Sequence, residues 1–356
     1  MIPASLPLAH LEALTDQHGL FEHARGDVPR RERGYCVDDV ARALALTARE
    51  DGRSDAAADL TDRYLRFVES AVAGDGRVHN RMSPDGCWTD RPATGDWWGR
   101  ALWGLGVAAR WSTRDRVRER ARVAFQRASQ VRSPWLRAMC FAAVGAAEAA
   151  GADDADDAAL ALLRDAADAF TALRPASSGW LWVEPRLRYA NAAIPEAFVA
   201  AGSALGEDKL LDQGTRLLRF LISIETRPDG HLSPTPVGGR GPRDARPAFD
   251  QQPIEAAALA QACARTFEAT GDEQWLAPLR AAWDWFQGAN DSRATLFDPV
   301  TGAGYDGLTR TGRNDNRGAE STLAALATLQ CLQRVSAERA RGAPARPVDA
   351  SAYVRD

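Results

Sequence analysis

Two kinds of hydrophobic pattern alternate along the chain, and both have a helical period. In the first kind, alanine-rich segments are apolar on nearly every face. A helix with no polar face is buried on all sides, so we expect these segments to form inner helices. They are residues 37–50, 97–111, 134–150, 189–205, 253–270 and 318–335.

The second kind of segment is amphipathic. Leu60, Tyr64 and Phe67 fall on one helical stripe, and the same spacing of apolar residues recurs in 160–170 and 276–286. The remaining positions of these segments carry charge. Such helices have one face on a core and one face in water, so we expect them to surround the inner helices.

The connections between segments alternate in length as well. Links from an inner to an outer helix are short, whereas links from an outer to the next inner helix are long. A further helix near 4–16 and a loop at 17–36 complete about twelve helices in six pairs. This organisation predicts an all-α (α/α)6 toroid over residues 1–340, followed by a disordered tail at 341–356. A superhelical array is the competing architecture, but no period near ~34 residues recurs.

Composition excludes several classes of protein. Hydrophobic residues make up 45% and charged residues 26%, and the formal net charge of -4 gives no reason to expect a nucleic-acid partner. Every apolar run is shorter than the ~18 residues of a membrane span. The N-terminus lacks the pattern of a signal peptide. The five cysteines are scattered without a C-x-x-C pair. We therefore expect a cytoplasmic protein with reduced thiols, no metal and no cofactor.

Polar and aromatic residues gather where the long loops enter the inner helices. Because these junctions all precede inner-helix N-termini, we expect them to share one face of the ring. Flat aromatic rings cover the C–H faces of sugars, while acids, amides and guanidiniums bind hydroxyls. The predicted substrate-binding residues are His23, Tyr35, Asp38, Asp96, Trp97, Arg100, Trp182, Arg186, Asn191, Gln251, Gln252, Asp306, Asn314 and Asn316.

Carboxyl groups at the same junctions suggest acid–base chemistry, since glycoside hydrolysis uses a pair of carboxyls. Glu184 is the first choice for the acid, because flanking aromatic residues would favour its protonated form. Asp39 or Asp250, at helix N-termini that favour an anion, is the choice for the base. Glu255 and Glu320 are the reserve catalytic residues.

These acids also have a structural interpretation. Asp38, Asp39, Asp96 and Asp250 stand at helix starts, where a carboxylate caps free N–H groups. Glu255 and Glu320 lie a turn inside apolar helices, where an unpaired carboxylate is costly. Arginines at neighbouring junctions would pair with them there.

Over nearly its whole length the chain resembles a bacterial family of (α/α)6 proteins encoded near β-1,2-mannoside phosphorylases and glycosyltransferases. The most specific stretches are 34–44, 182–191, 249–256 and 306–323. The resemblance implies a toroid and a carbohydrate context. The chain departs from the family at Trp98, where a small residue or histidine is usual, so we expect a narrowed cleft. It departs again at Ala190, where the family often has Asp.

We therefore predict a carbohydrate-active enzyme, a glycoside hydrolase acting on an oligosaccharide that contains mannose. One alternative is a sugar epimerase or isomerase, for which His23 is the best-placed base. Another is a non-catalytic glycan-binding accessory protein of a glycosyltransferase system. The toroid is shared with all these classes of carbohydrate-active protein, so the fold alone does not separate them.

Overall fold

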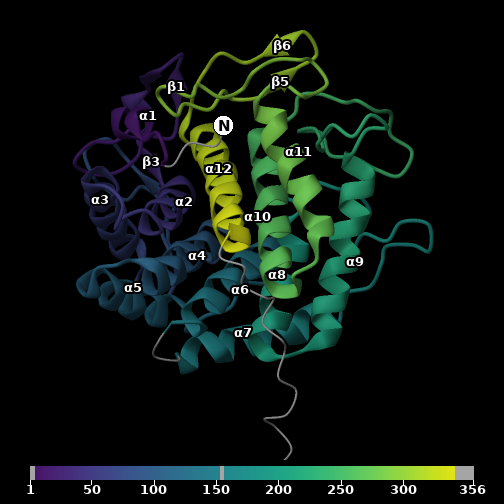
Figure 1. The fold of residues 1–356 in the computed structure, drawn as a ribbon. Coiled ribbons are helices and arrows are strands. Elements are labelled where there is room, and N and C mark those ends of the chain that lie inside the picture. The colour runs from purple at the N-terminus through teal and green to yellow at the C-terminus, as the bar shows by residue number, and fades with distance from the viewer. Residues whose placement is uncertain (1–4, 153–155, 341–356) are drawn as a thin grey trace, which may run out of the picture.

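A closed ring of helices forms the centre of the computed structural model, which describes residues 5–152 and 156–340 (Figure 1). Each inner helix contacts the next, and the last contacts the first, so the ring predicted from the sequence is confirmed. The predicted tail at 341–356 lies outside the described residues. The inner helices are α2 (Val37–Ala48), α4 (Asp96–Trp111), α6 (Leu136–Ala150), α8 (Ala193–Leu205), α10 (Pro253–Thr270) and α12 (Ala319–Ala340).

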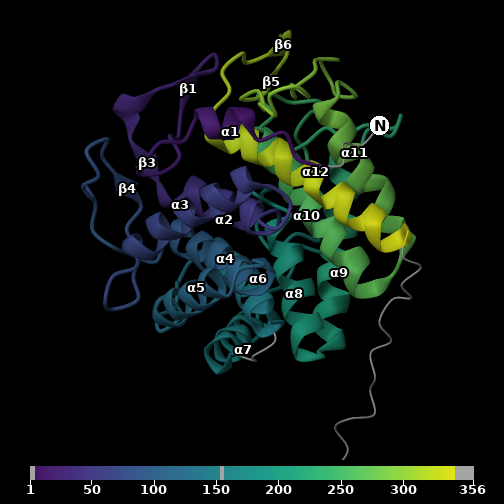
Figure 2. The ribbon, with the colours of Figure 1, turned by 60° about the vertical axis from the view of Figure 1, so that its left-hand side comes forward.

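Outer helices surround this ring, and each one except α1 contacts the inner helix that precedes it in the chain (Figure 2). The sixth outer position, beside α12, is taken by the short helix α1 (Ala9–Ala13) rather than by the helix predicted at 4–16. The chain turns after α1, where the Asp16 carboxylate accepts the N–H groups of His18 and Gly19. The other outer helices are α3 (Asp55–Ala71), α5 (Asp115–Ala128), α7 (Asp157–Thr171), α9 (Asp208–Glu225) and α11 (Leu276–Phe286).

Small residues let the inner helices approach closely. A Cβ atom on Gly106 of α4 would lie 2.0 Å from the carbonyl oxygen of Gly145 on α6. A Cβ atom on Gly145 would lie 2.3 Å from the carbonyl oxygen of Leu102. Both distances are far inside van der Waals contact, so these helices pack backbone against backbone. This packing explains why the inner segments are rich in alanine and glycine.

One inner helix begins later than predicted. The sequence pattern predicts a helix from residue 189, whereas α8 begins at Ala193. Ala190 has a φ of 45°, and the backbone N–H groups of Ala190 and Asn191 donate to the Glu255 carboxylate instead of entering a helix. This segment therefore forms part of the loop that leads into α8.

Short elements fold the long loops. The hairpins are β1 (Ala24–Arg25) with β2 (Val28–Pro29), β3 (Tyr35–Cys36) with β4 (Arg81–Met82), and β5 (Leu308–Thr309) with β6 (Gly312–Arg313). Two 3-10 helices, η1 (Arg31–Arg33) and η2 (Glu273–Trp275), complete the described elements. Both views place β1 and the β5–β6 hairpin together near the start of α12 (Figures 1 and 2).

We call the end of the ring formed by the inner-helix N-termini the rim, and the end formed by their C-termini the base. At the base, buried Glu148 of α6 accepts hydrogen bonds from Arg49 at 2.8 Å, Arg265 at 2.8 Å, Arg110 at 3.1 Å and the Trp111 indole at 2.8 Å. One carboxylate thus ties α2, α4, α6 and α10 together. Among the described helices, none is long and apolar enough to cross a membrane.

Candidate active site at the rim

Arg42 joins the first and last inner helices at the rim. Its two terminal nitrogens donate to one Glu320 oxygen at 3.0 Å each. The same guanidinium lies 3.1 Å from the Asp39 carboxylate and 3.5 Å from the Asp38 carboxylate. Acids predicted from distant parts of the sequence are therefore brought together around one cation.

Arg100 of α4 is the second buried cation of the rim. Its Nε lies 2.6 Å from Asp38, and a terminal nitrogen donates to the Tyr189 hydroxyl. The guanidinium also lies 4.0 Å from the centre of the Phe141 ring. Two arginines thus hold the Asp38 carboxylate, which stays 28% exposed. The carboxylate is therefore positioned by two cations and remains accessible to a ligand.

Arg137 of α6 forms a third ion pair, with Glu184 in the loop before α8. Both terminal nitrogens of Arg137 donate to the two Glu184 oxygens at 2.8 Å, which is the strong bidentate arrangement. The Nε of Arg137 donates to the Tyr189 carbonyl oxygen. The environment predicted for Glu184 was apolar and suited to a proton donor. Both Glu184 oxygens instead accept hydrogen bonds from Arg137, so we remove Glu184 from the acid role.

Asp96, the first residue of α4, has the environment of a proton donor. Burial raises the pKa of Asp96 above its ordinary value; Arg100 opposes this shift and Asp38 adds to it. Within the described part of the chain, no hydrogen bond or ion pair involves the Asp96 side chain, which is partly exposed. The sequence pattern predicts a substrate-binding role for Asp96, and in the structure burial favours its protonated form.

Asp39 and Glu255 are too buried to meet a substrate, at 2% and 3% exposed. Burial raises the pKa of Asp39 to about 7, against the effect of Arg42. Burial and the nearby Glu225 raise the pKa of Glu255 to about 8, although Asn191 donates to it from its backbone and from its side chain. Both acids hold rim backbone and neighbouring helices in place, so we remove them from the catalytic set.

The raised pKa of Asp39 has a measurable consequence. Its ordinary value is 3.8 and its folded value is about 7, so between these pH values the folded state keeps a proton that the unfolded state has lost. The free energy of unfolding should therefore fall as pH rises, by up to about 1.4 kcal/mol per pH unit from this group. Urea denaturation at pH 5, 6 and 7 should show that the free energy of unfolding depends less on pH in Asp39→Asn than in wild type. Asp115→Asn, at an exposed helix start, should keep the wild-type slope, and identical slopes in all three proteins would contradict the assignment.

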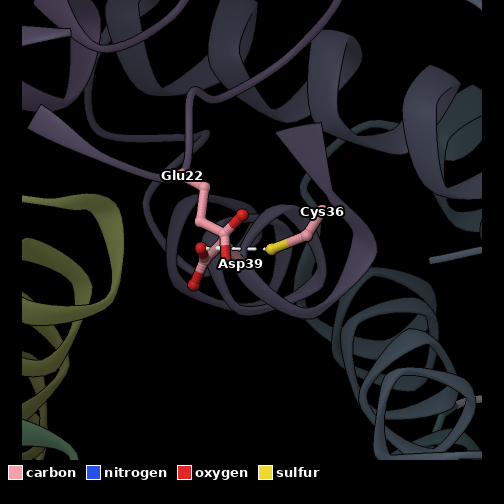
Figure 3. A group of neighbouring side chains, drawn as sticks. All are labelled: Glu22, Cys36 and Asp39. Carbon is pink, nitrogen blue, oxygen red and sulfur yellow. Dashed lines mark hydrogen bonds between the residues drawn. The ribbon is translucent and has the colours of Figure 1, made fainter. Parts of the chain in front are cut away.

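Glu22, Cys36 and Asp39 form a group that could hold a metal ion, with ligand atoms within 4.8 Å of one another (Figure 3). The Cys36 thiol, however, donates to an Asp39 oxygen at 3.2 Å, and burial raises the pKa of that thiol. Glu22 is paired with Arg81, and Asp39 with Arg42. Because an arginine already pairs with each of the two carboxylates, this group does not require a metal ion. That the protein binds no metal stays a prediction.

Trp182, which the sequence predicts to meet a sugar, lies in the core together with two other tryptophans. Trp182 is fully buried and Trp180 nearly so, and both rings contact Phe220 of α9. Trp98 is also fully buried, with its indole N–H on the Ala128 carbonyl oxygen at 3.0 Å, so it narrows no cleft. These three residues belong to the core, and we remove Trp182 from the binding set.

Trp135 is an exposed aromatic residue at this end of the ring. It stands at the N-cap of α6, two residues before Arg137, and is 64% exposed. The exposure of Trp135 was not predicted, because the apolar pattern of residues 134–150 indicates a helix that is buried on all sides. Ser133 is a sequence signal for a turn at the start of this helix, because its hydroxyl oxygen accepts the Trp135 N–H at 3.1 Å.

Three further predicted binding residues stabilise loops. The Tyr35 hydroxyl is buried and donates to Asp16 at 2.8 Å. Gln251 is fully buried and donates to Asp291 at 2.7 Å. Asp306 accepts the Gly318 N–H at 2.7 Å at the start of α12. We assign these residues, and the buried Asn191, to the support of the rim.

The remaining predicted residues lie at the surface or in loop contacts. Arg186 pairs with Asp244 at 2.7 Å, and the Trp97 indole donates to a loop carbonyl oxygen at 2.7 Å. Asn316 accepts the N–H of Gly26 at 3.1 Å. No contact of the described residues joins these side chains to Asp38 or Asp96. The other residues of this set are the exposed His23, Asp250 and Asn314 and the half-buried Gln252.

Comparison with known proteins confirms the fold. No family model and no curated protein sequence matches the chain. Cellobiose 2-epimerase from Bacillus thermoamylovorans superposes with a TM-score of 0.70 at 12% identity, over 93% of this chain and 96% of the other. A sugar epimerase from a ruminal bacterium gives 0.68 at 13% identity, over 92% and 95%. An α-1,6-mannanase of Salegentibacter, in complex with α-1,6-mannotetrose, gives 0.64 at 10% identity, over 92% and 96%. The chain is thus an (α/α)6 toroid.

Proposed function

We propose that this protein is a carbohydrate-active enzyme, a glycoside hydrolase that cleaves an oligosaccharide at the rim. The observation that carries the proposal is the contrast between two accessible acids. Asp38 lies in ion-pair contact with both Arg42 and Arg100, while burial favours the protonated form of the unpaired Asp96. Two neighbouring carboxyls in such different environments are the arrangement that acid–base catalysis needs.

The roles follow from these environments. Asp96 donates its proton to the oxygen of the leaving sugar as the glycosidic C–O bond breaks. Asp38 takes a proton from the water that attacks the anomeric carbon, so Asp96 ends the step as a carboxylate and Asp38 as a carboxylic acid, and proton exchange with solvent restores both. Arg100 and Tyr189 fix the position of Asp38. Glu320, 32% exposed and held by Arg42, binds a hydroxyl group.

The α-1,6-mannanase that shares the fold was solved as an inactive variant in which two consecutive aspartates are replaced by alanine. Consecutive Asp38 and Asp39 open an inner helix in this chain, and Asp38 is the accessible one. Together with the family resemblance, this makes mannose-containing oligosaccharides the first substrates to test.

Trp135 supplies the aromatic platform of the proposed site. We expect Trp135→Ala to weaken oligosaccharide binding by up to about tenfold, because the ring would cover one face of a sugar. Trp111→Ala is the matched control, since Trp111 is 42% exposed but lies at the base. Isothermal titration with mannotetraose measures both variants. Equal affinity in Trp135→Ala and wild type, or a loss confined to Trp111→Ala, would place the sugar elsewhere.

A sugar epimerase is the second candidate, because two solved epimerases share the fold. That chemistry in toroids generally uses histidine bases. In the described chain, no histidine pairs with Asp38, Asp96 or Glu320, and His23 is 52% exposed beside Glu22. Incubation with mannobiose and cellobiose separates the candidates: release of reducing ends supports the hydrolase, and conversion of one sugar into another without release supports the epimerase. Tight binding without either reaction would support an accessory protein.

A further inference from the structure

A cavity lined by both apolar and cationic side chains runs along the ring axis from the rim cations to the base. Its volume for water-sized groups is about 50 Å³. Arg42 and Arg100 close it at the rim, where both are almost fully buried. Arg49, Arg265 and Arg334 line the other end of the cavity. Those three side chains are 12%, 15% and 23% exposed, so the cavity opens toward the base.

Cationic donors in this cavity are left without partners. A guanidinium has five N–H donors. One nitrogen of Arg49 donates to Glu148. The Nε of Arg334 lies 2.6 Å from the Glu268 carboxylate. In the described residues, the terminal nitrogens of Arg334 and the Gln261 side chain, which also lines the cavity, make no hydrogen bond.

Five arginines line the cavity, and Glu196 is the lining carboxylate among the described residues. At the base, Arg49, Arg265 and Arg334 each pair with a glutamate. Burial lowers the pKa of Arg49, whereas the paired carboxylates raise the pKa of Arg265 and of Arg334. The guanidinium and amide donors that remain free, rather than an excess of positive charge, are therefore what a bound anion would meet.

We propose that the base of the cavity is a binding site for a phosphate group, separate from the rim site. Guanidiniums from α2, α10 and α12 converge there, and planar guanidinium donors match phosphate oxygens well. The terminal nitrogens of Arg334 and Arg49 donate to the phosphate oxygens, and the Gln261 amide adds a neutral donor. The phosphate comes from the free anion or from a phosphorylated sugar.

Phosphate titration tests this site directly. Isothermal titration is carried out with inorganic phosphate and with glucose 6-phosphate, at constant ionic strength in chloride buffer. Arg334→Gln should weaken phosphate binding by at least about tenfold, because it removes charge-assisted hydrogen bonds. Arg339→Gln is the matched control on the same helix, since Arg339 is exposed and pairs with Glu273 outside the cavity. Thermal unfolding of each protein, with and without phosphate, shows that both variants are folded.

The outcomes separate the alternatives. Equal affinity for the two ligands identifies free phosphate, and tighter binding of glucose 6-phosphate identifies a phosphorylated sugar; both support the site. Absence of phosphate binding by wild type overturns it. Equal loss in Arg334→Gln and Arg339→Gln also overturns it, because it shows a diffuse surface effect. Hydrolysis at the rim is not required for any of these results.

Discussion

Replacing Asp96 by asparagine is expected to lower oligosaccharide hydrolysis by about 10²- to 10⁴-fold, the usual contribution of a general acid. The loss should be much smaller for a p-nitrophenyl glycoside, whose leaving group departs without protonation. Asp38→Asn should lose activity on both substrates, because water activation is needed for each. Measurement of kcat/KM on the two substrates therefore separates the two roles.

Asp115→Asn is the matched control for Asp96→Asn. Each aspartate is the first residue of its helix, but Asp115 opens the outer helix α5. We expect the control to keep wild-type activity. Because the Asp96 side chain makes no hydrogen bond or ion pair with the described residues, Asp96→Asn should also unfold at the wild-type temperature. More than about a tenth of wild-type hydrolysis in Asp96→Asn would remove Asp96 from the acid role.

A second large effect is expected on the stability of the protein when the buried ion-pair network at the base is broken. Glu148→Ala should lower the free energy of unfolding by about 3–5 kcal/mol, because it leaves Arg49 and Arg265 buried without their shared carboxylate. Burial opposes ionisation of Glu148, but Arg49, Arg265 and Arg110 outweigh it and hold its pKa well below the ordinary 4.5. This stabilisation is therefore complete above pH 4.5 and lost as pH falls toward the folded pKa.

Glu119→Ala provides the control for that measurement, since Glu119 pairs with Arg122 on an exposed face of α5. Urea denaturation at pH 7 should place this control within about 0.5 kcal/mol of wild type. A cost for Glu148→Ala as small as that of Glu119→Ala would show that the buried network contributes little.

The ring could be predicted from the sequence because its cause is local. Apolar periodicity and alanine content mark the inner helices, and the alternation of short and long links orders them. Helix starts then place Asp38 and Asp96 at a common end, where Arg100 contacts Asp38. The late start of α8 could not be predicted, because it depends on Glu255, which is 65 residues away from Ala190 in the sequence.

The chemistry of individual side chains was less predictable. Glu184 looked like an acid among aromatic residues until its partner Arg137, 47 residues earlier, was in view. A loop tryptophan can face the core or the solvent, and sequence spacing does not decide between them. Trp182, which was predicted to face a sugar, is buried. Trp135, in a segment that was predicted to be buried, is exposed.

A crystal of the protein soaked with α-1,6-mannotetraose tests the central claim most directly. We expect an oligosaccharide at the rim, with a sugar ring on Trp135 and a glycosidic oxygen within hydrogen-bond distance of Asp96. Soaking Asp96→Asn crystals would preserve the uncleaved chain for this observation. An oligosaccharide bound at the base or on the outer helices, with no sugar near Asp38 and Asp96, would contradict it.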